Sequence, residues 1–99
     1  MYKVIWDNLA KKELKEALKY IQRDSLQSAE KIKKDIIEKT HSLCQQPLRY
    51  AADKFRIDRD VKFRAVEVKK FRISYYINEP SKEVFILRIR NTKQEPLPY

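Results

Sequence analysis

Residues 62–96, KFRAVEVKKFRISYYINEPSKEVFILRIRNTKQEP, determine the fold that this chain is predicted to adopt. Apolar residues recur at every second position in residues 71–78, and Phe85, Leu87 and Ile89 repeat this spacing further on. A period of two is typical of a strand with one buried face and one polar face. An Asn-Glu-Pro-Ser sequence between the two segments is a turn signal. The stretch therefore predicts three short strands joined by tight turns.

Cations gather on the polar face of these predicted strands. In the expected hairpin register, Arg72 lies opposite Arg88 and Lys70 lies opposite Arg90. Like charges in opposite positions of a sheet lower its stability, and an anion from outside the chain would remove that cost. Alternatively, each arginine extends into solvent or pairs with a nearby carboxylate. Because four cations cluster there, we interpret this face as a binding surface for an anion.

Length and charge narrow the class of protein. The 99 residues have the size of one small domain, so we expect a single domain over residues 1–99. Lysine and arginine together number 23, against 14 acidic residues, which gives a net charge of +9 at neutral pH. Such an excess favours binding to nucleic acid or to an acidic protein partner.

Several kinds of site have no sequence signal in this chain. A single cysteine cannot form an internal disulfide, and no cluster of cysteine and histidine indicates a metal. The chain contains no glycine, which excludes the glycine-rich loops that bind nucleotide phosphates. We therefore expect no cofactor. No signal peptide or membrane-spanning segment is visible, so the protein is predicted to be soluble and cytoplasmic, with no membrane partner.

The residues before the strand region predict one further strand and two helices. Residues 2–6 are apolar and suited to a strand, and Asp7 is a helix N-cap. A second helix begins with Asp24 or Ser25 as its cap, and a long connection follows with a short extended piece around residues 55–57. This order predicts an α+β fold, in which the N-terminal strand and a helical hairpin pack on one face of a mainly antiparallel sheet.

Three short motifs occur in a fixed order along the C-terminal half. They are Phe63-Arg64, then Phe71-Arg72-Ile73-Ser74-Tyr75, then Asn91-Thr92-Lys93-Gln94-Glu95-Pro96. Together with the order of elements, they resemble the RelE/ParE superfamily of toxins. The resemblance implies the toxin of a two-gene toxin–antitoxin module, held inactive by a cognate acidic antitoxin whose C-terminal segment wraps around it. ParE-like members inhibit DNA gyrase, and RelE-like members cut mRNA in the ribosomal A site.

The predicted target-binding site lies on the polar face of the C-terminal strands and in the segment after them. Arg72 is the first candidate, because it matches a phosphate-binding arginine of the RelE-like enzymes and its forked donors suit an oxyanion. The resemblance also suggests Arg72, Lys93 and Tyr99 as candidate catalytic residues. The proposed contacts to the target are Arg64, Arg72, Arg88, Arg90, Asn91 and Lys93.

The residues favour one of the two toxin activities. Cleavage of RNA by a 2′-hydroxyl needs a base, an acid and a cation for the phosphate, and arginine cannot be the base because it stays protonated. Glu67 is expected to pair with Arg72 across a tight turn, and His41 lies on the second helix, away from the cationic face. Asn91 takes a position where some RNA-cleaving relatives have histidine, and an amide cannot transfer protons. Without a visible acid and base pair, gyrase inhibition is preferred and ribosome-dependent mRNA cleavage is the alternative.

A third hypothesis is a nucleic-acid-binding module that is not toxic. In this interpretation Tyr76 and Phe63 would stack on bases beside the cations of the polar face. A single-strand binder would carry more exposed aromatic residues than these two, because the other aromatic residues of the strands fall on the face predicted to cover the helices. We therefore rank this hypothesis after the two toxin activities.

Overall fold

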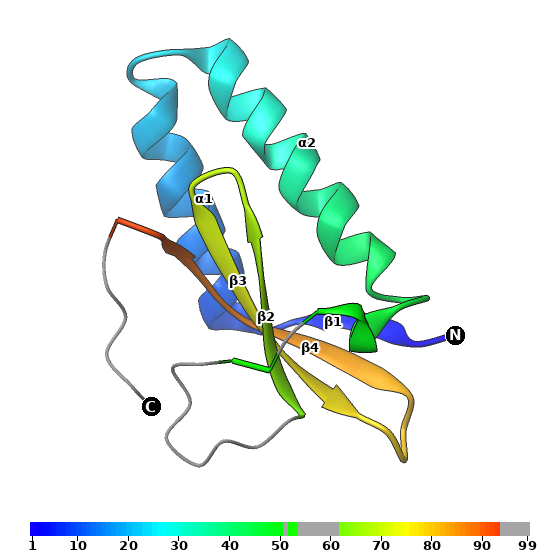
Figure 1. The fold of residues 1–99 in the computed structure, drawn as a ribbon. Coiled ribbons are helices and arrows are strands. Elements are labelled where there is room, and N and C mark those ends of the chain that lie inside the picture. Colours follow the sequence, from blue (N-terminus) through cyan, green and yellow to red (C-terminus); the bar gives the residue numbers. More distant parts are fainter. Residues whose placement is uncertain (51, 54–61, 94–99) are drawn as a thin grey trace.

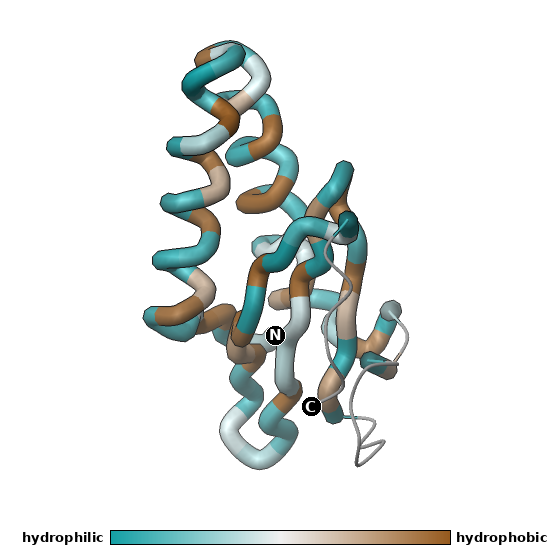
Figure 2. The backbone as a smooth tube through the Cα atoms, turned by 90° about the vertical axis from the view of Figure 1, so that its left-hand side faces the viewer, coloured by the Kyte–Doolittle hydropathy of each residue, from teal (hydrophilic) through white to brown (hydrophobic). Residues whose placement is uncertain are grey.

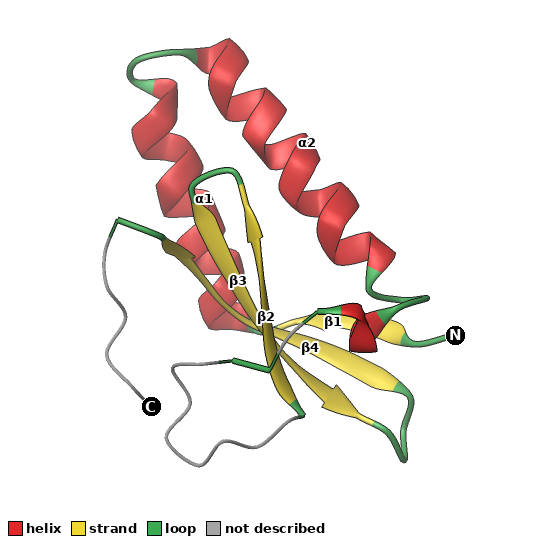
Figure 3. Ribbon diagram, viewed as in Figure 1, coloured by secondary structure: helices red, strands yellow, loops and turns green. Residues whose placement is uncertain are grey.

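The computed structural model describes residues 1–50, 52–53 and 62–93, so the extended piece predicted around residues 55–57 lies outside it. Helices and strands follow one another in the predicted order, and the α+β prediction is confirmed (Figures 1 and 3). The elements are β1 (Lys3–Trp6), α1 (Asn8–Gln22), α2 (Leu26–Ser42), a short 3-10 helix (Pro47–Arg49), β2 (Phe63–Val68), β3 (Phe71–Asn78) and β4 (Glu83–Asn91).

The four described strands form one mixed sheet in the order β1-β4-β3-β2. The β2–β3 and β3–β4 pairs are antiparallel hairpins, as expected of strands joined by tight turns. β1 pairs with β4 in parallel, because the helical hairpin carries the chain back to the same end of the sheet before the later strands begin. The prediction of a mainly antiparallel sheet is therefore confirmed.

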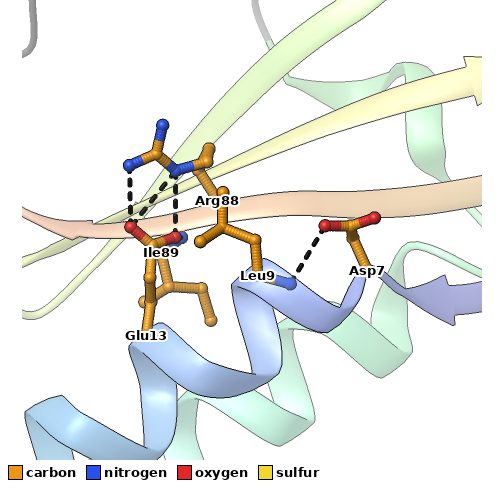
Figure 4. Close-up of polar contacts among 5 residues, drawn as sticks. All are labelled: Asp7, Leu9, Glu13, Arg88 and Ile89. Carbon is orange, nitrogen blue, oxygen red and sulfur yellow. Dashed lines mark hydrogen bonds and ion pairs between the residues drawn. The ribbon is translucent and has the colours of Figure 1, made fainter.

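Both helices begin at residues that satisfy their first free N–H groups. The Asp7 carboxylate accepts a hydrogen bond from the Leu9 amide at 3.0 Å (Figure 4), and the Ser25 hydroxyl accepts one from the Ser28 amide at 3.1 Å. Ser25 is thus the cap of α2, rather than Asp24. Such caps typically stabilise a helix by about 1 kcal/mol. Among the described helices, none has the length and apolar character needed to cross a membrane.

The core lies between the helical hairpin and one face of the sheet. Figure 2 shows apolar and polar positions recurring along both helices. Apolar residues three or four positions apart share one side of a helix, and this side faces the core. Each large aliphatic side chain that is buried there contributes about 1.5–3 kcal/mol relative to an exposed one. The buried members are Ala10, Leu14, Ile36, Leu43, Val66, Val68, Phe71, Ile73, Tyr75, Ile77, Val84, Ile86 and Ile89.

A β-bulge in β4 changes the predicted hairpin register. The predicted register, with Arg72 opposite Arg88, places Glu83 opposite Ile77. In the structure Glu83 pairs with Asn78 instead, and the ladder then shifts between Ser74 and Tyr75 of β3. A one-residue slip moves every side chain of a strand to the other face, and the extra residue of a bulge reverses that slip. Val84 and Ile86 therefore fill the core in place of Phe85 and Leu87, whose predicted burial is wrong, whereas the predicted burial of Ile89 is confirmed.

The residue before β1 is tied to the turn between β3 and β4. The Tyr2 hydroxyl lies 2.9 Å from both carboxylate oxygens of Glu79, and the Lys82 ammonium lies 3.2 Å from one of them. The hydrogen bond from Tyr2, assisted by Lys82, lowers the pKa of Glu79. The Tyr2–Glu79 contact joins positions 77 residues apart in the sequence. It holds the start of the chain against the turn between β3 and β4.

Candidate functional site

Two arginines face each other on the side of the sheet opposite to the helices. In the observed register Arg72 lies opposite Arg90, and Ser74 lies opposite Arg88. The predicted pairing of Arg72 with Arg88 is therefore wrong, because it did not include the bulge. Lys70 is part of the β2–β3 turn and lies opposite no residue of β4. A pair of like charges in opposite positions is nevertheless present, as the alternation predicted.

Arg72 takes part in an ion pair that is largely removed from solvent. Its Nη2 lies 2.7 Å from Oδ1 of Asp53, whose side chain is fully buried, while that of Arg72 is 11% exposed. The carboxylate of Glu67, on β2, lies 3.8 Å from Nη1, which confirms the expected cross-strand pair. The interpretation of Arg72 as a cation that waits for an external anion is therefore wrong, because the connection before β2 supplies Asp53.

Arg88 is directed toward α1. Its Nε and Nη2 donate to the Glu13 carboxylate at 2.9–3.1 Å, and the backbone N–H of Ile89 donates to the same carboxylate at 3.0 Å (Figure 4). β1 ends at Trp6, opposite Ile86, so the remainder of β4 has no neighbour on that side among the described strands. Glu13 thus satisfies both a guanidinium and a backbone donor at the uncovered edge of β4.

The last strand ends in two polar residues, Arg90 and Asn91, which point to opposite faces of the sheet. Arg90 is half-buried, and Asn91 lies opposite Phe71 at the end of the ladder. The Asn91 side-chain oxygen accepts a hydrogen bond from the backbone N–H of Lys93 at 2.9 Å, which orders the turn after the strand. Asn91 and Lys93 are therefore next to Arg90 along the chain, as predicted. Tyr99 lies outside the described residues.

Arg64 belongs to the opposite face of the sheet. It lies opposite Tyr75 in the β2–β3 ladder, and its Nη1 donates to the backbone oxygens of Tyr50 at 2.6 Å and Leu48 at 3.5 Å. Successive residues of a strand point to alternate faces, so Arg64 shares a face with Val66. Arg64 was predicted to be a target contact beside the cations of the polar face, and the structure places it on the other face.

The described part of the chain brings no histidine to the arginine pair. His41 is exposed in the last turn of α2, on a different element, as predicted. No group of three or more histidine, cysteine or acidic side chains that could hold a metal occurs among the described residues.

The two aromatic residues considered for base stacking contact each other. The rings of Phe63 and Tyr76 are 4.7 Å apart between centroids, at an angle of 46°. They line a shallow hollow of about 330 Å³ together with Phe85 and Leu87. Because Phe63 and Tyr76 are packed as a cross-strand pair, their contact contributes to the sheet. This arrangement weakens the hypothesis of a base-stacking surface.

A large hollow in the described residues lies between the two helices. It has a volume of about 720 Å³ and an apolar lining that includes Ile37, which is 43% exposed. Lys11, Lys15 and Lys19 form one row along α1, because residues four apart lie on the same side of a helix. We call this hollow the hairpin groove. Its lining residues are Trp6, Lys11, Leu14, Lys15, Leu18, Lys19, Gln22, Ala29, Glu30, Lys33 and Ile37.

The amino-acid sequence alone does not locate the hairpin groove. The spacing of the lysines is visible in the sequence, but it indicates a site only when the second helix lies beside the first. The distance between the two helices therefore decides whether a groove exists.

Comparisons with known proteins identify one family and several similar folds. The family model described as the ParE toxin of the type II toxin–antitoxin system parDE matches residues 4–96. The chromosomal ParDE system from P. aeruginosa is 24% identical with a TM-score of 0.70, over 92% of this chain and 96% of that chain. A RelBE toxin–antitoxin complex from Mycobacterium tuberculosis is 19% identical with a TM-score of 0.62, over 91% and 96%. No curated protein sequence matches.

Proposed function

We propose that this chain, which belongs to the ParE toxin family of type II toxin–antitoxin systems, arrests growth by inhibiting DNA gyrase. The family match over residues 4–96 is the observation that carries the proposal. We call the side of the sheet that carries Arg72 and Arg90 the arginine face. It agrees with gyrase inhibition, because its described residues offer cations without a histidine that could transfer protons. We propose Arg90, Asn91 and Lys93, beside Arg72, as the contacts to the target.

Ribosome-dependent cleavage of mRNA is the second candidate. The opposed pair of Arg72 and Arg90 favours it, since two forked guanidinium groups on one face suit a phosphate in a crowded transition state. In this reaction the pair would bind the phosphate, and the proton transfers would fall to other groups, such as Glu67, Lys93 or Tyr99. Arg72 is paired with Asp53, so a phosphate bound at Arg72 would share the guanidinium with that carboxylate.

Two assays on the purified protein distinguish these activities. We expect growth arrest when the protein is expressed alone, and we expect the purified protein to block DNA supercoiling by gyrase. Primer extension on mRNA from translating ribosomes should then show no new ends. Cleaved mRNA with normal supercoiling would instead identify the second activity. Normal growth, with no effect in either assay, would favour the third hypothesis of a binding module that is not toxic.

We propose that the partner of the toxin is an acidic antitoxin, with an amphipathic segment that occupies the hairpin groove. The groove combines an apolar floor with four lysines and a single glutamate along its lining. A helix or extended segment with apolar residues on one side and carboxylates at its margins would complement both features. Association should therefore combine electrostatic attraction with burial of apolar side chains.

Replacing Ile37 with glutamate is expected to weaken antitoxin binding by on the order of 100-fold, because a carboxylate would be buried in the apolar floor against an acidic partner. Leu26→Glu is the matched control, since Leu26 is also exposed on α2 but does not line the groove. Binding kinetics measured by surface plasmon resonance check both variants. High salt should slow association more than it speeds dissociation. Equal losses in the two variants would place the antitoxin elsewhere.

A further inference from the structure

A second cluster of cations surrounds Tyr50, outside the arginine face. The Lys39 ammonium lies 3.3 Å from the Tyr50 hydroxyl and 5.6 Å from the ring centroid, and the Arg49 guanidinium carbon lies 5.9 Å from that centroid. Arg64 donates to the backbone oxygen of Tyr50 at 2.6 Å. Leu48 is exposed beside them, at 57%. We call these five residues the Tyr50 patch.

The three cations of the Tyr50 patch differ from Arg72 and Arg88 in their partners. Within the described ranges of the chain, Lys39, Arg49 and Arg64 form no ion pair with a carboxylate. Their hydrogen-bond partners among the described residues are a phenol, a glutamine side chain and backbone carbonyls, which are all neutral. The positive charge of the patch is therefore not neutralised by the described part of the protein.

The Tyr50 patch is held in place by the core. The hydroxyl of Tyr75, which is fully buried, donates to the backbone oxygen of Pro47 at 2.6 Å, and burial raises the pKa of Tyr75. The phenol therefore keeps its proton and its hydrogen bond well into the alkaline range. Because Pro47 begins the 3-10 helix that leads into Tyr50, the patch is preorganised, and a ligand would lose little free energy in ordering it.

The shape of the cluster selects one class of ligand. Arg64 lies at the backbone end of Tyr50 and Lys39 at its hydroxyl tip, so the cations form a row rather than a single pocket. In an extended peptide, alternate side chains lie on one side with a spacing of about 7 Å. Carboxylates at such positions can reach successive cations of a row, whereas one small ion can satisfy only part of it.

We propose that the Tyr50 patch binds an acidic segment of a protein partner. Carboxylates of that segment would pair with Lys39, Arg49 and Arg64, and an apolar side chain would contact Leu48. Tyrosine and arginine beside an exposed apolar residue are typical of protein interfaces. Lys39 and Arg49 lie over the Tyr50 ring, which leaves less of that ring for a nucleic-acid base. The patch shares no residue with the hairpin groove, so this site does not depend on the proposed function.

The experiment titrates hexaglutamate into the isotope-labelled protein and follows backbone amides and arginine Nε–H groups by NMR. We expect the largest shifts at the Tyr50 patch. The variant Lys39→Gln/Arg49→Gln should bind the peptide about ten times more weakly, since each solvent-exposed ion pair contributes up to about 1 kcal/mol. Hexaglutamine, which has no charge, should cause no shifts. Arg64 is left intact because it is part of β2.

The matched control is Arg23→Gln/Lys31→Gln, which removes the same two charge types from exposed positions outside the patch and the groove. Its affinity for hexaglutamate should fall by less than about twofold. An equal loss in both double variants would overturn the proposal, because binding would then follow net charge alone. The proposal would also fail if a six-nucleotide oligo(dT) shifted the same residues at lower concentration than the peptide, since the patch would then be a nucleic-acid surface.

Discussion

Replacing Arg72 with alanine is expected to lower the free energy of unfolding by about 3 kcal/mol, because one partner of a buried ion pair is removed. The Asp53 carboxylate has no exposed side-chain surface, and the Arg72 guanidinium lies 2.7 Å from it. Without that cation, the cost of keeping the carboxylate away from water rises. Urea denaturation followed by circular dichroism measures the change, provided that the dependence on urea concentration is unaltered.

Two further variants identify the cause of the loss. Lys70→Ala removes one exposed cation from the adjacent turn, and it should change stability by less than about 0.5 kcal/mol. The double variant Asp53→Asn/Arg72→Ala should recover part of the loss, since the buried negative charge is removed as well. If Arg72→Ala were no less stable than Lys70→Ala, the buried pair would contribute little.

Because instability alone reduces toxicity, the toxicity of Arg72→Ala must be compared at equal amounts of folded protein.

The second large effect is expected at Glu13, whose carboxylate joins α1 to β4. Glu13→Ala should lower the free energy of unfolding by about 2 kcal/mol, because Arg88 and the backbone N–H of Ile89 lose their acceptor together. Glu13→Gln should cost less, since an amide oxygen can still accept from one of these donors. Urea denaturation gives the total change, and hydrogen exchange of the Ile89 amide reports the edge of β4 directly.

Glu16→Ala is the control for Glu13. Glu16 lies on the same helix, is exposed and carries the same charge, so its replacement should leave both readouts nearly unchanged. Exchange of the Ile89 amide should become at least several times faster in Glu13→Ala but not in Glu16→Ala. Unaltered exchange in Glu13→Ala would mean that another group protects this amide and that the hydrogen bond is not important.

The order and type of the elements were predictable because they depend on local patterns. Alternation over residues 71–78 predicts β3 without knowledge of its neighbours, and the capping residues Asp7 and Ser25 mark the two helices. The strand register was not predictable in the same way. A bulge near Leu87 depends on how the whole strand fits the core, and Phe85 and Leu87 are as apolar as the residues that replaced them there.

The candidate site was predicted in composition but not in its partners. Arg72 and Arg90 share one face because alternation along each strand requires it. Glu67 was identified as a neighbour of Arg72 across the tight turn. Asp53 and Glu13 could not be identified from spacing, since Asp53 precedes Arg72 by 19 positions and Glu13 precedes Arg88 by 75. Asp53 lies in a connection with no periodic pattern, and Glu13 resembled any other surface charge on a helix. Such contacts follow only from the tertiary arrangement.

The parallel contact between β1 and β4 has a consequence for the order of folding. The β2–β3–β4 hairpins need only short loops, whereas β1 must find a partner at the other end of the chain, as the 77-residue separation of Tyr2 and Glu79 illustrates. Closing a long loop costs more conformational entropy than closing a hairpin. We therefore expect the three C-terminal strands to form first when the complete chain folds, and β1 to pair with β4 last. Substitutions in β1 should then accelerate unfolding and leave the folding rate almost unchanged.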